Sequence, residues 1–122
     1  MDKRELAAHI RSGEGISTEF KRCGNRPEKD FFETVCSFAN RQGGNIFLGV
    51  EDDGTVSGVA ENSALGVKRN IANVLNDPNL FRPAPLVKVE DVDYDGRDEV
   101  LHMGYVLNSD GTLRWNNSEI IH

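Results

Sequence analysis

Three stretches of the chain carry apolar residues at helical spacing, and each is predicted to be a helix. The first of these stretches has Leu6 and Ile10 stacked one turn apart, behind the capping residue Asp2. The second has the widest apolar face, which includes Phe31, Phe32, Val35, Cys36, Phe38 and Ala39. Glycine, proline and turn sequences mark the ends, so that the predicted helices lie between residues 2 and 13, 27 and 43, and 62 and 78.

Shorter segments between these helices have the polarity pattern of strands. ISTEFK, residues 16–21, alternates, so Ile16, Thr18 and Phe20 are predicted to face inward, while Glu19 and Lys21 lie side by side on the other face. NIFLGV, residues 45–50, is almost entirely apolar, which is typical of a central strand. EDDG, residues 51–54, has the composition of a turn and predicts a hairpin with the following TVSGV.

The last third of the chain predicts a second hairpin. Residues 80–85 contain two prolines and are expected to form a loop, and residues 86–92 and 99–107 read as strands around a Tyr-Asp-Gly turn. The full order is α-β-α-β-β-α-β-β. It indicates an α/β (α+β) fold with about three helices on a mixed sheet, and 122 residues fit a single domain, 1–122.

Composition and charge restrict the classes of partner. No apolar run is long enough to span a bilayer, and two cysteines without motif spacing, Cys23 and Cys36, favour a reducing, cytoplasmic setting and no membrane partner. The net charge of −6 argues against a protein that simply coats DNA. Residues 1–50 carry eight Lys or Arg against seven Asp or Glu, while residues 51–122 carry six against thirteen. The first half is therefore the better candidate surface for nucleic acid.

Three carboxylates could form a metal site. Glu14 lies in the loop before the first predicted strand, Glu19 on that strand, and Asp52 just beyond the central strand. Mg²⁺ and Mn²⁺ are bound by a few protein oxygens together with water and phosphate, and such a metal can activate water for phosphodiester cleavage. Lys21 would place a positive charge beside the phosphate. The alternative is that Glu14, Glu19 and Lys21 are simply the solvated face of an edge strand, and that Asp52 is a solvated acid near the end of a strand.

Basic residues of the first half are candidates for phosphate contacts. They are Lys21, Arg22, Arg26 and Arg41. Arg41 has a second explanation, because a cation at a helix C-terminus complements the helix dipole. Gly43 and Gly44 are explained by ending the helix, and no GxxxxGK[ST] phosphate-binding loop occurs in the sequence.

Two parts of the sequence together resemble the Schlafen Alba-type domain. They are GEGISTEFKR, residues 13–22, and FFETVCSFANRQGGNIFLGVEDDGTVSGV, residues 31–59. The matching features are a Gly-Glu pair, a Glu-Phe-Lys strand, a helix ending in Phe-Ala-Asn before Gly-Gly, a Leu-Gly-Val strand and a Glu-Asp-Asp-Gly turn. The resemblance continues more loosely to about residue 107. The combined pattern is specific, whereas no single piece of it is.

This resemblance implies an α/β domain of bacterial and archaeal proteins, commonly at the start of a longer regulator, with nucleic-acid binding as its default role. In vertebrate Schlafen proteins the same domain is a metal-dependent endoribonuclease that cuts structured RNA such as tRNA with three acidic residues. Glu14, Glu19 and Asp52 match those positions. The resemblance thus implies Mg²⁺ or Mn²⁺ at these carboxylates, although no cofactor follows with certainty from the sequence.

Two departures from the family pattern bear on assembly and completeness. The vertebrate enzymes are pseudo-dimers of two such lobes around a basic cradle, so this single lobe would need a homodimer to rebuild the cradle. The family's closing strand, which contains proline and serine, is replaced by MGYVLNSDGTLRWNNSEIIH, residues 103–122. A domain truncated at its C-terminus, with further domains absent from this chain, and a reduced family member are both consistent with this ending.

Three functions are consistent with the sequence. The first is a nucleic-acid-binding domain, DNA-binding and part of a transcriptional regulator, whose affinity would fall with salt. The second is an Mg²⁺- or Mn²⁺-dependent endoribonuclease that uses Glu14, Glu19, Asp52 and Lys21. The third is a protein-interaction module, which would suit the acidic second half. Fold alone does not decide among them, because function belongs to sites.

Overall fold

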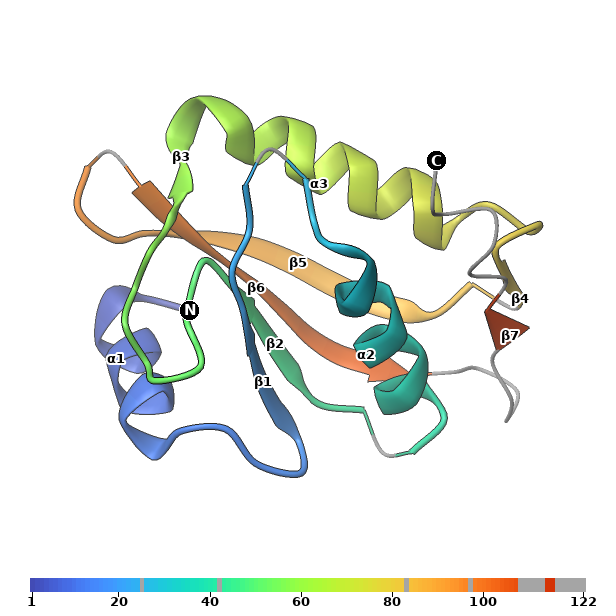
Figure 1. Cartoon of the computed structure of the whole chain (residues 1–122), viewed down its shortest axis with the longest axis horizontal. Coiled ribbons are helices and arrows are strands. Elements are labelled where there is room, and N and C mark those ends of the chain that lie inside the picture. The colour runs from blue at the N-terminus through green and yellow to red at the C-terminus, as the bar shows by residue number, and fades with distance from the viewer. Residues whose placement is uncertain (25, 42, 83, 97, 108–113, 116–122) are drawn as a thin grey trace.

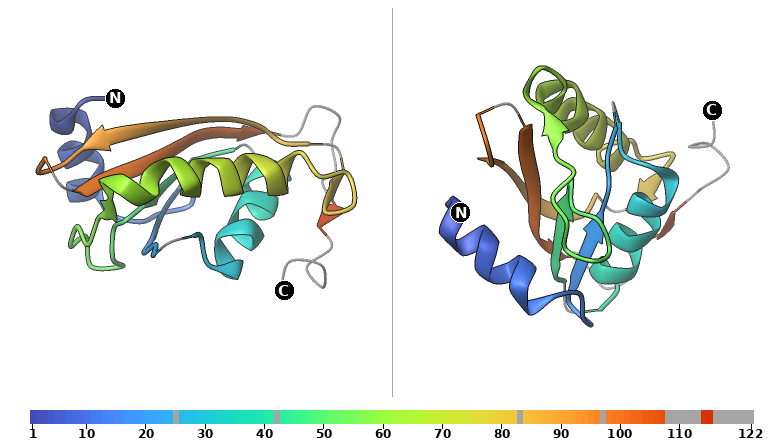
Figure 2. Two further views of the ribbon diagram at one scale, coloured as in Figure 1. Left: turned by 90° about the horizontal axis from the view of Figure 1, so that it is seen from above. Right: turned by 60° about the vertical axis from the view of Figure 1, so that its left-hand side comes forward.

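The chain folds into three layers. A computed structural model describes residues 1–24, 26–41, 43–82, 84–96, 98–107 and 114–115. Its helices are α1 (Lys3–Ser12), α2 (Lys29–Ala39) and α3 (Glu61–Leu75). A mixed sheet lies in the middle, with α1 against one face and α2 and α3 against the other (Figure 1, Figure 2). The α/β (α+β) class and the order of elements are confirmed. No helix in the described part of the chain is long and apolar enough to cross a membrane.

The central sheet is built around one long strand. Its members are β1 (Thr18–Lys21), β2 (Asn45–Leu48), β3 (Val59–Ala60), β5 (Leu86–Asp93) and β6 (Asp98–Leu107). β6 pairs antiparallel with β2, β3 and β5. β1 pairs parallel with β2, with Thr18 opposite Asn45 and Lys21 opposite Leu48. Among the described strands β1 forms one edge of the sheet, as predicted.

Alternation along β2 divides the core into two parts. Ile46 and Leu48 are buried against α2 and α3, whereas Phe47, between them, is buried with Leu6 of α1 and Phe20 of β1. Successive side chains of a strand point to opposite faces of the sheet. Because Phe20 faces α1, its neighbours Glu19 and Lys21 face the α2 side of the sheet, at its edge.

The predicted helix ends are confirmed at α1 and α2. The Asp2 side chain accepts a hydrogen bond from the Glu5 N–H at 2.8 Å, and Gly13 ends α1 with φ of +78°. After α2, Gly43 has φ of +78° and its N–H donates to the Phe38 carbonyl at 2.9 Å. Glycine adopts this left-handed conformation without steric cost, so the chain can turn sharply into β2.

Three sequence expectations are wrong in detail. Ile16 is 86% exposed, because the chain turns through a bridge between Gly15 and Thr18 before β1 begins. The predicted hairpin after residue 50 is a single Val50–Val56 bridge, and β3 pairs with β6 instead of β2. Residues 81–82 of the predicted loop form β4 (Phe81–Arg82), which pairs with β7 (Arg114–Trp115). Both pairings join distant segments, and a local pattern does not contain that information.

Candidate functional site

A cleft of about 460 Å³ lies beside the C-terminal end of β1, the first turn of α2 and the turn after β2. We call it the β1 cleft. Besides Phe20, its lining holds six carboxylates and two basic side chains: Glu14, Glu19, Glu28, Asp30, Glu51, Asp52, Lys21 and Arg22. The structure thus brings into one cleft the three carboxylates and the lysine that the sequence singled out.

Glu14 is held against the outer edge of β1. Its Oε1 accepts a hydrogen bond from the Phe20 N–H at 3.2 Å. An edge strand leaves such N–H groups without a partner strand, and a carboxylate from the preceding loop satisfies this one. The contact fixes the direction of Glu14 along the strand. It also explains structurally why a carboxylate occupies this loop.

Asp52 reaches the cleft from the turn after β2. The other two acids of this turn have local partners: Glu51 Oε2 accepts from Ser57 Oγ at 2.9 Å, and Asp53 Oδ1 accepts from the Thr55 N–H at 2.9 Å. Asp52 instead lines the cleft, where its charge contributes to raising the pKa of Glu14. The turn therefore directs its middle carboxylate into the β1 cleft.

Glu19 and Lys21 project from β1 toward α2. Lys21 Nζ lies 3.4 Å from Glu19 Oε1 and 2.9 Å from Asp30 Oδ2, in the first turn of α2. Desolvation opposes the charge of Lys21, but hydrogen bonds and attraction from Asp30 and Glu19 outweigh it and raise the lysine pKa. Lys21 therefore remains an ammonium ion at physiological pH.

The arrangement of the cleft disfavours the negative charge of Glu14 and so raises its pKa. Desolvation raises its pKa most, the Phe20 N–H lowers it, and the charges of Glu19 and Asp52 raise it further. A carboxylate surrounded in this way binds a proton or a metal ion more readily than an isolated one. The β1 cleft is thus a place where added positive charge is favourable.

The donor chemistry of the cleft suits a hard divalent cation, which prefers carboxylate oxygens. The positions of these side chains suit a metal ion less well than their chemistry does. Among the described residues, no three His, Cys, Asp or Glu side chains are grouped so that they could hold a metal ion. Glu19 and Asp52 both lie near enough to Glu14 for their charges to raise its pKa, and Glu19 is also paired with Lys21. Glu14, Glu19 and Asp52 would be the ligands after a rearrangement of Glu19.

The four predicted phosphate-binding residues do not form one patch. Lys21 and Arg22 line the cleft, and Arg26 is exposed in the connection to α2. Arg41 lies beyond the far end of α2. The 11 residues of this helix, at ~1.5 Å each, separate that end by about 16 Å from the first turn, which borders the cleft. There its guanidinium bonds Ser37 and lies over the Phe38 ring.

Sequence reasoning missed three residues that line the cleft: Glu28, Asp30 and Glu51. Glu28 and Asp30 lie at the start of α2, where acids also complement the helix dipole. A signal was available, because α2 connects two parallel neighbouring strands. The start of such a crossover helix lies near the C-terminal end of the strand before it.

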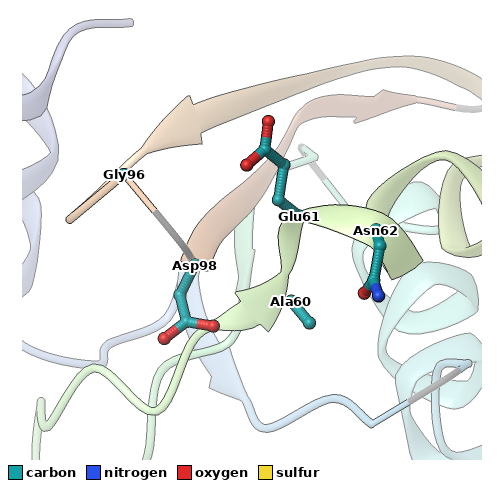
Figure 3. A pocket seen from close by; sticks show the side chains of 5 residues that line it. All are labelled: Ala60, Glu61, Asn62, Gly96 and Asp98. Carbon is teal, nitrogen blue, oxygen red and sulfur yellow. The ribbon is translucent and has the colours of Figure 1, made fainter.

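A second pocket, of about 660 Å³, lies where β3 leads into α3. Figure 3 shows its five lining residues, Ala60, Glu61, Asn62, Gly96 and Asp98. Glu61 and Asp98 point in different directions there (Figure 3). We call this the β3 pocket.

The family model described as Schlafen, AlbA_2 matches residues 14–112 of the chain. This range begins at Glu14 and contains every residue that lines the β1 cleft. Comparison with curated proteins finds no match.

Proposed function

This chain belongs to the Schlafen AlbA_2 family, and we propose that its β1 cleft is the active site of a metal-dependent endonuclease with structured RNA as its substrate class. Family membership supports a nucleic-acid-binding or nuclease-like function. The choice of cleavage is an inference from the cleft, and the choice of RNA follows the resemblance to the vertebrate enzymes.

The charge of the β1 cleft carries the proposal. Six carboxylates face two basic side chains, and both basic side chains are already paired: Lys21 with Glu19 and Asp30, and Arg22 Nε with Glu28 at 3.8 Å. A phosphate would meet a net negative surface there. It can approach these carboxylates favourably only when cations lie between them.

The residues of the cleft have distinct roles in this proposal. Glu14, Glu19 and Asp52 would hold the metal, and bound Mg²⁺ or Mn²⁺ would stabilise phosphate charge and activate water. Lys21 would contact the scissile phosphate. Arg22, whose side chain is 71% exposed, would contact the nucleic acid at the rim of the cleft.

Cleavage of tRNA, single-stranded DNA and duplex DNA with Mn²⁺, Mg²⁺ or EDTA tests the proposal. Cutting should require metal and should be lost in Asp52→Asn. Asp53→Asn is the matched control, because it makes the same charge change one residue away, keeps an oxygen for the Thr55 N–H and does not line the cleft. Cutting that continues in EDTA, or that is equal in the two variants, would contradict the proposal.

A second candidate is nucleic-acid binding without cleavage, as the DNA-binding part of a transcriptional regulator. It is favoured by the exposure of Arg22 and Arg26 on the connection that borders the cleft. A salt-sensitive gel shift without cutting would support it. Replacing both arginines by alanine should then reduce the slope of log affinity against log salt by about two.

A further inference from the structure

Lys21 occupies the position at which two carboxylates of the β1 cleft converge. Its Nζ bridges Glu19 of β1 and Asp30 of α2, and its side chain is only 16% exposed, against 29% for Glu19 and 52% for Asp30. The ammonium ion is therefore the positive charge of this part of the cleft. Glu19, which would be a metal ligand, is paired with it.

We propose that Lys21 is a resident cation that competes with the metal for Glu19, and that Asp30 is the positioning residue that withdraws Lys21 from Glu19 when the metal binds. This inference rests on the proposed function, because it concerns the same carboxylates. It assigns a role to Asp30 that the acidic trio alone does not contain.

The two contacts of Lys21 are unequal in a way that supports this role. The Asp30 contact is 0.5 Å shorter, as the difference between 3.4 Å and 2.9 Å shows, and it comes from a different element. Asp30 sits next to Phe31 and Phe32, whose burial in the core fixes the first turn of α2. Lys21 can therefore keep Asp30 while Glu19 turns toward Glu14 and Asp52.

Electrostatics requires such a withdrawal. A divalent ion repels a positive charge that lies within about 4 Å of it, even when the protein screens the interaction strongly. An ammonium that stayed on Glu19 would oppose the metal, whereas one held by Asp30 remains at the cleft and can meet a phosphate oxygen. Asp30 thus keeps the Lys21 ammonium away from the metal ion, while both positive charges stay in the cleft.

Binding of Mn²⁺ alone to the full chain, followed by the electron paramagnetic resonance of free Mn²⁺, tests the proposal without any cleavage. Lys21→Met should tighten Mn²⁺ binding about tenfold, and Asp30→Asn should weaken it about fivefold, because Lys21 then keeps Glu19. In the double variant Asp30→Asn should change the affinity less than twofold. Glu33→Gln, an exposed acid of the same helix outside the cleft lining, is the charge control and should have no effect.

The outcomes separate this inference from the proposed function. If Asp30→Asn weakens binding equally with and without Lys21, Asp30 acts only by its charge and the inference is wrong. It is also wrong if Lys21→Met does not tighten binding. If the wild type does not bind Mn²⁺, or if Asp52→Asn binds it as well as the wild type, the metal site itself fails. Unchanged thermal unfolding of each variant shows that altered binding is not a loss of fold.

Discussion

Two regions of the molecule combine acidic residues with one lysine, and they differ in what the carboxylates face. In the β1 cleft, Glu14, Glu19 and Asp52 come from a loop, a strand and a turn and line an open volume. On β5 and β6, Asp91 and Glu99 lie diagonally on paired strands, and Lys68 of α3 is 3.2 Å from Asp91. Oε2 of Glu99 is buried.

The pKa values show that crowding alone does not distinguish a site. Desolvation, and then the charge of Asp91, raises the pKa of Glu99, much as burial and neighbouring acids raise that of Glu14. Glu99, however, has a buried oxygen between packed elements, whereas Glu14 and Asp52 open into a cleft that a phosphate and a metal could enter. A cluster of acidic residues therefore indicates a functional site only where a ligand can reach the carboxylates.

The largest difference between the two regions should be in activity. Glu19→Gln removes a proposed metal ligand and should lower metal-dependent cleavage roughly hundredfold or more. Glu99→Gln makes the same change in the other region and should leave the rate within about twofold. Initial rates of RNA cleavage at saturating Mn²⁺ measure both. Equal losses in the two variants would remove the distinction.

Replacing a glycine by alanine should destabilise the two sides of the molecule to different extents. Gly58, near Asp98 of the β3 pocket, has φ of +77°, and an added Cβ would lie 2.5 Å from the Asp98 Cβ. Gly13, beside the β1 cleft, has φ of +78° but open space around an added Cβ. We expect Gly58→Ala to lower the free energy of unfolding by about 3 kcal/mol or more, and Gly13→Ala by about 1–2 kcal/mol from backbone strain alone. Urea unfolding measures both, and the reverse order would contradict the close packing of Gly58 against Asp98.

Glu99→Gln should also stabilise the protein in a pH-dependent way. The raised pKa means that the folded state holds this proton more tightly than the unfolded state, so the stability it contributes is full below the usual pKa of 4.5 and is lost as pH rises through the folded value. The neutral amide, which can donate to Asp91, should add roughly 0.5–1 kcal/mol at pH 7 and almost nothing near pH 4. Urea titrations at the two pH values check the sign. Destabilisation at pH 7 would show that the carboxylate is favourable where it is.

The smallest expected effect concerns Lys68. Its side chain is 31% exposed and that of Asp91 is 39% exposed, so solvent screens their ion pair. Lys68→Met should change the free energy of unfolding by no more than about 0.5 kcal/mol, and less in 1 M NaCl. Thermal unfolding at low and high salt measures it. A loss several times larger would mean that this lysine is a structural centre of its region.

The residues of the candidate site differed in how far sequence could predict them. Glu19 and Lys21 follow from strand alternation around Phe20, and Glu14 and Asp52 were singled out as candidates through motif spacing and resemblance. The sequence did not predict Asp30, because its partner Lys21 lies across a strand-to-helix connection. It also placed Ile16 inward, because alternation does not reveal that the Gly15–Thr18 turn delays the strand.

The sequence by itself determined the three helices, the edge and central strands, the second hairpin and the family, because periodicity, capping and motif order are local properties of the chain. Only the tertiary structure decided that β3 pairs with β6, that β4 pairs with β7, and that Lys21 is shared between Glu19 and Asp30. These contacts join segments whose approach depends on how the helices pack on the sheet. Packing is a property of the whole chain, and no short segment encodes it.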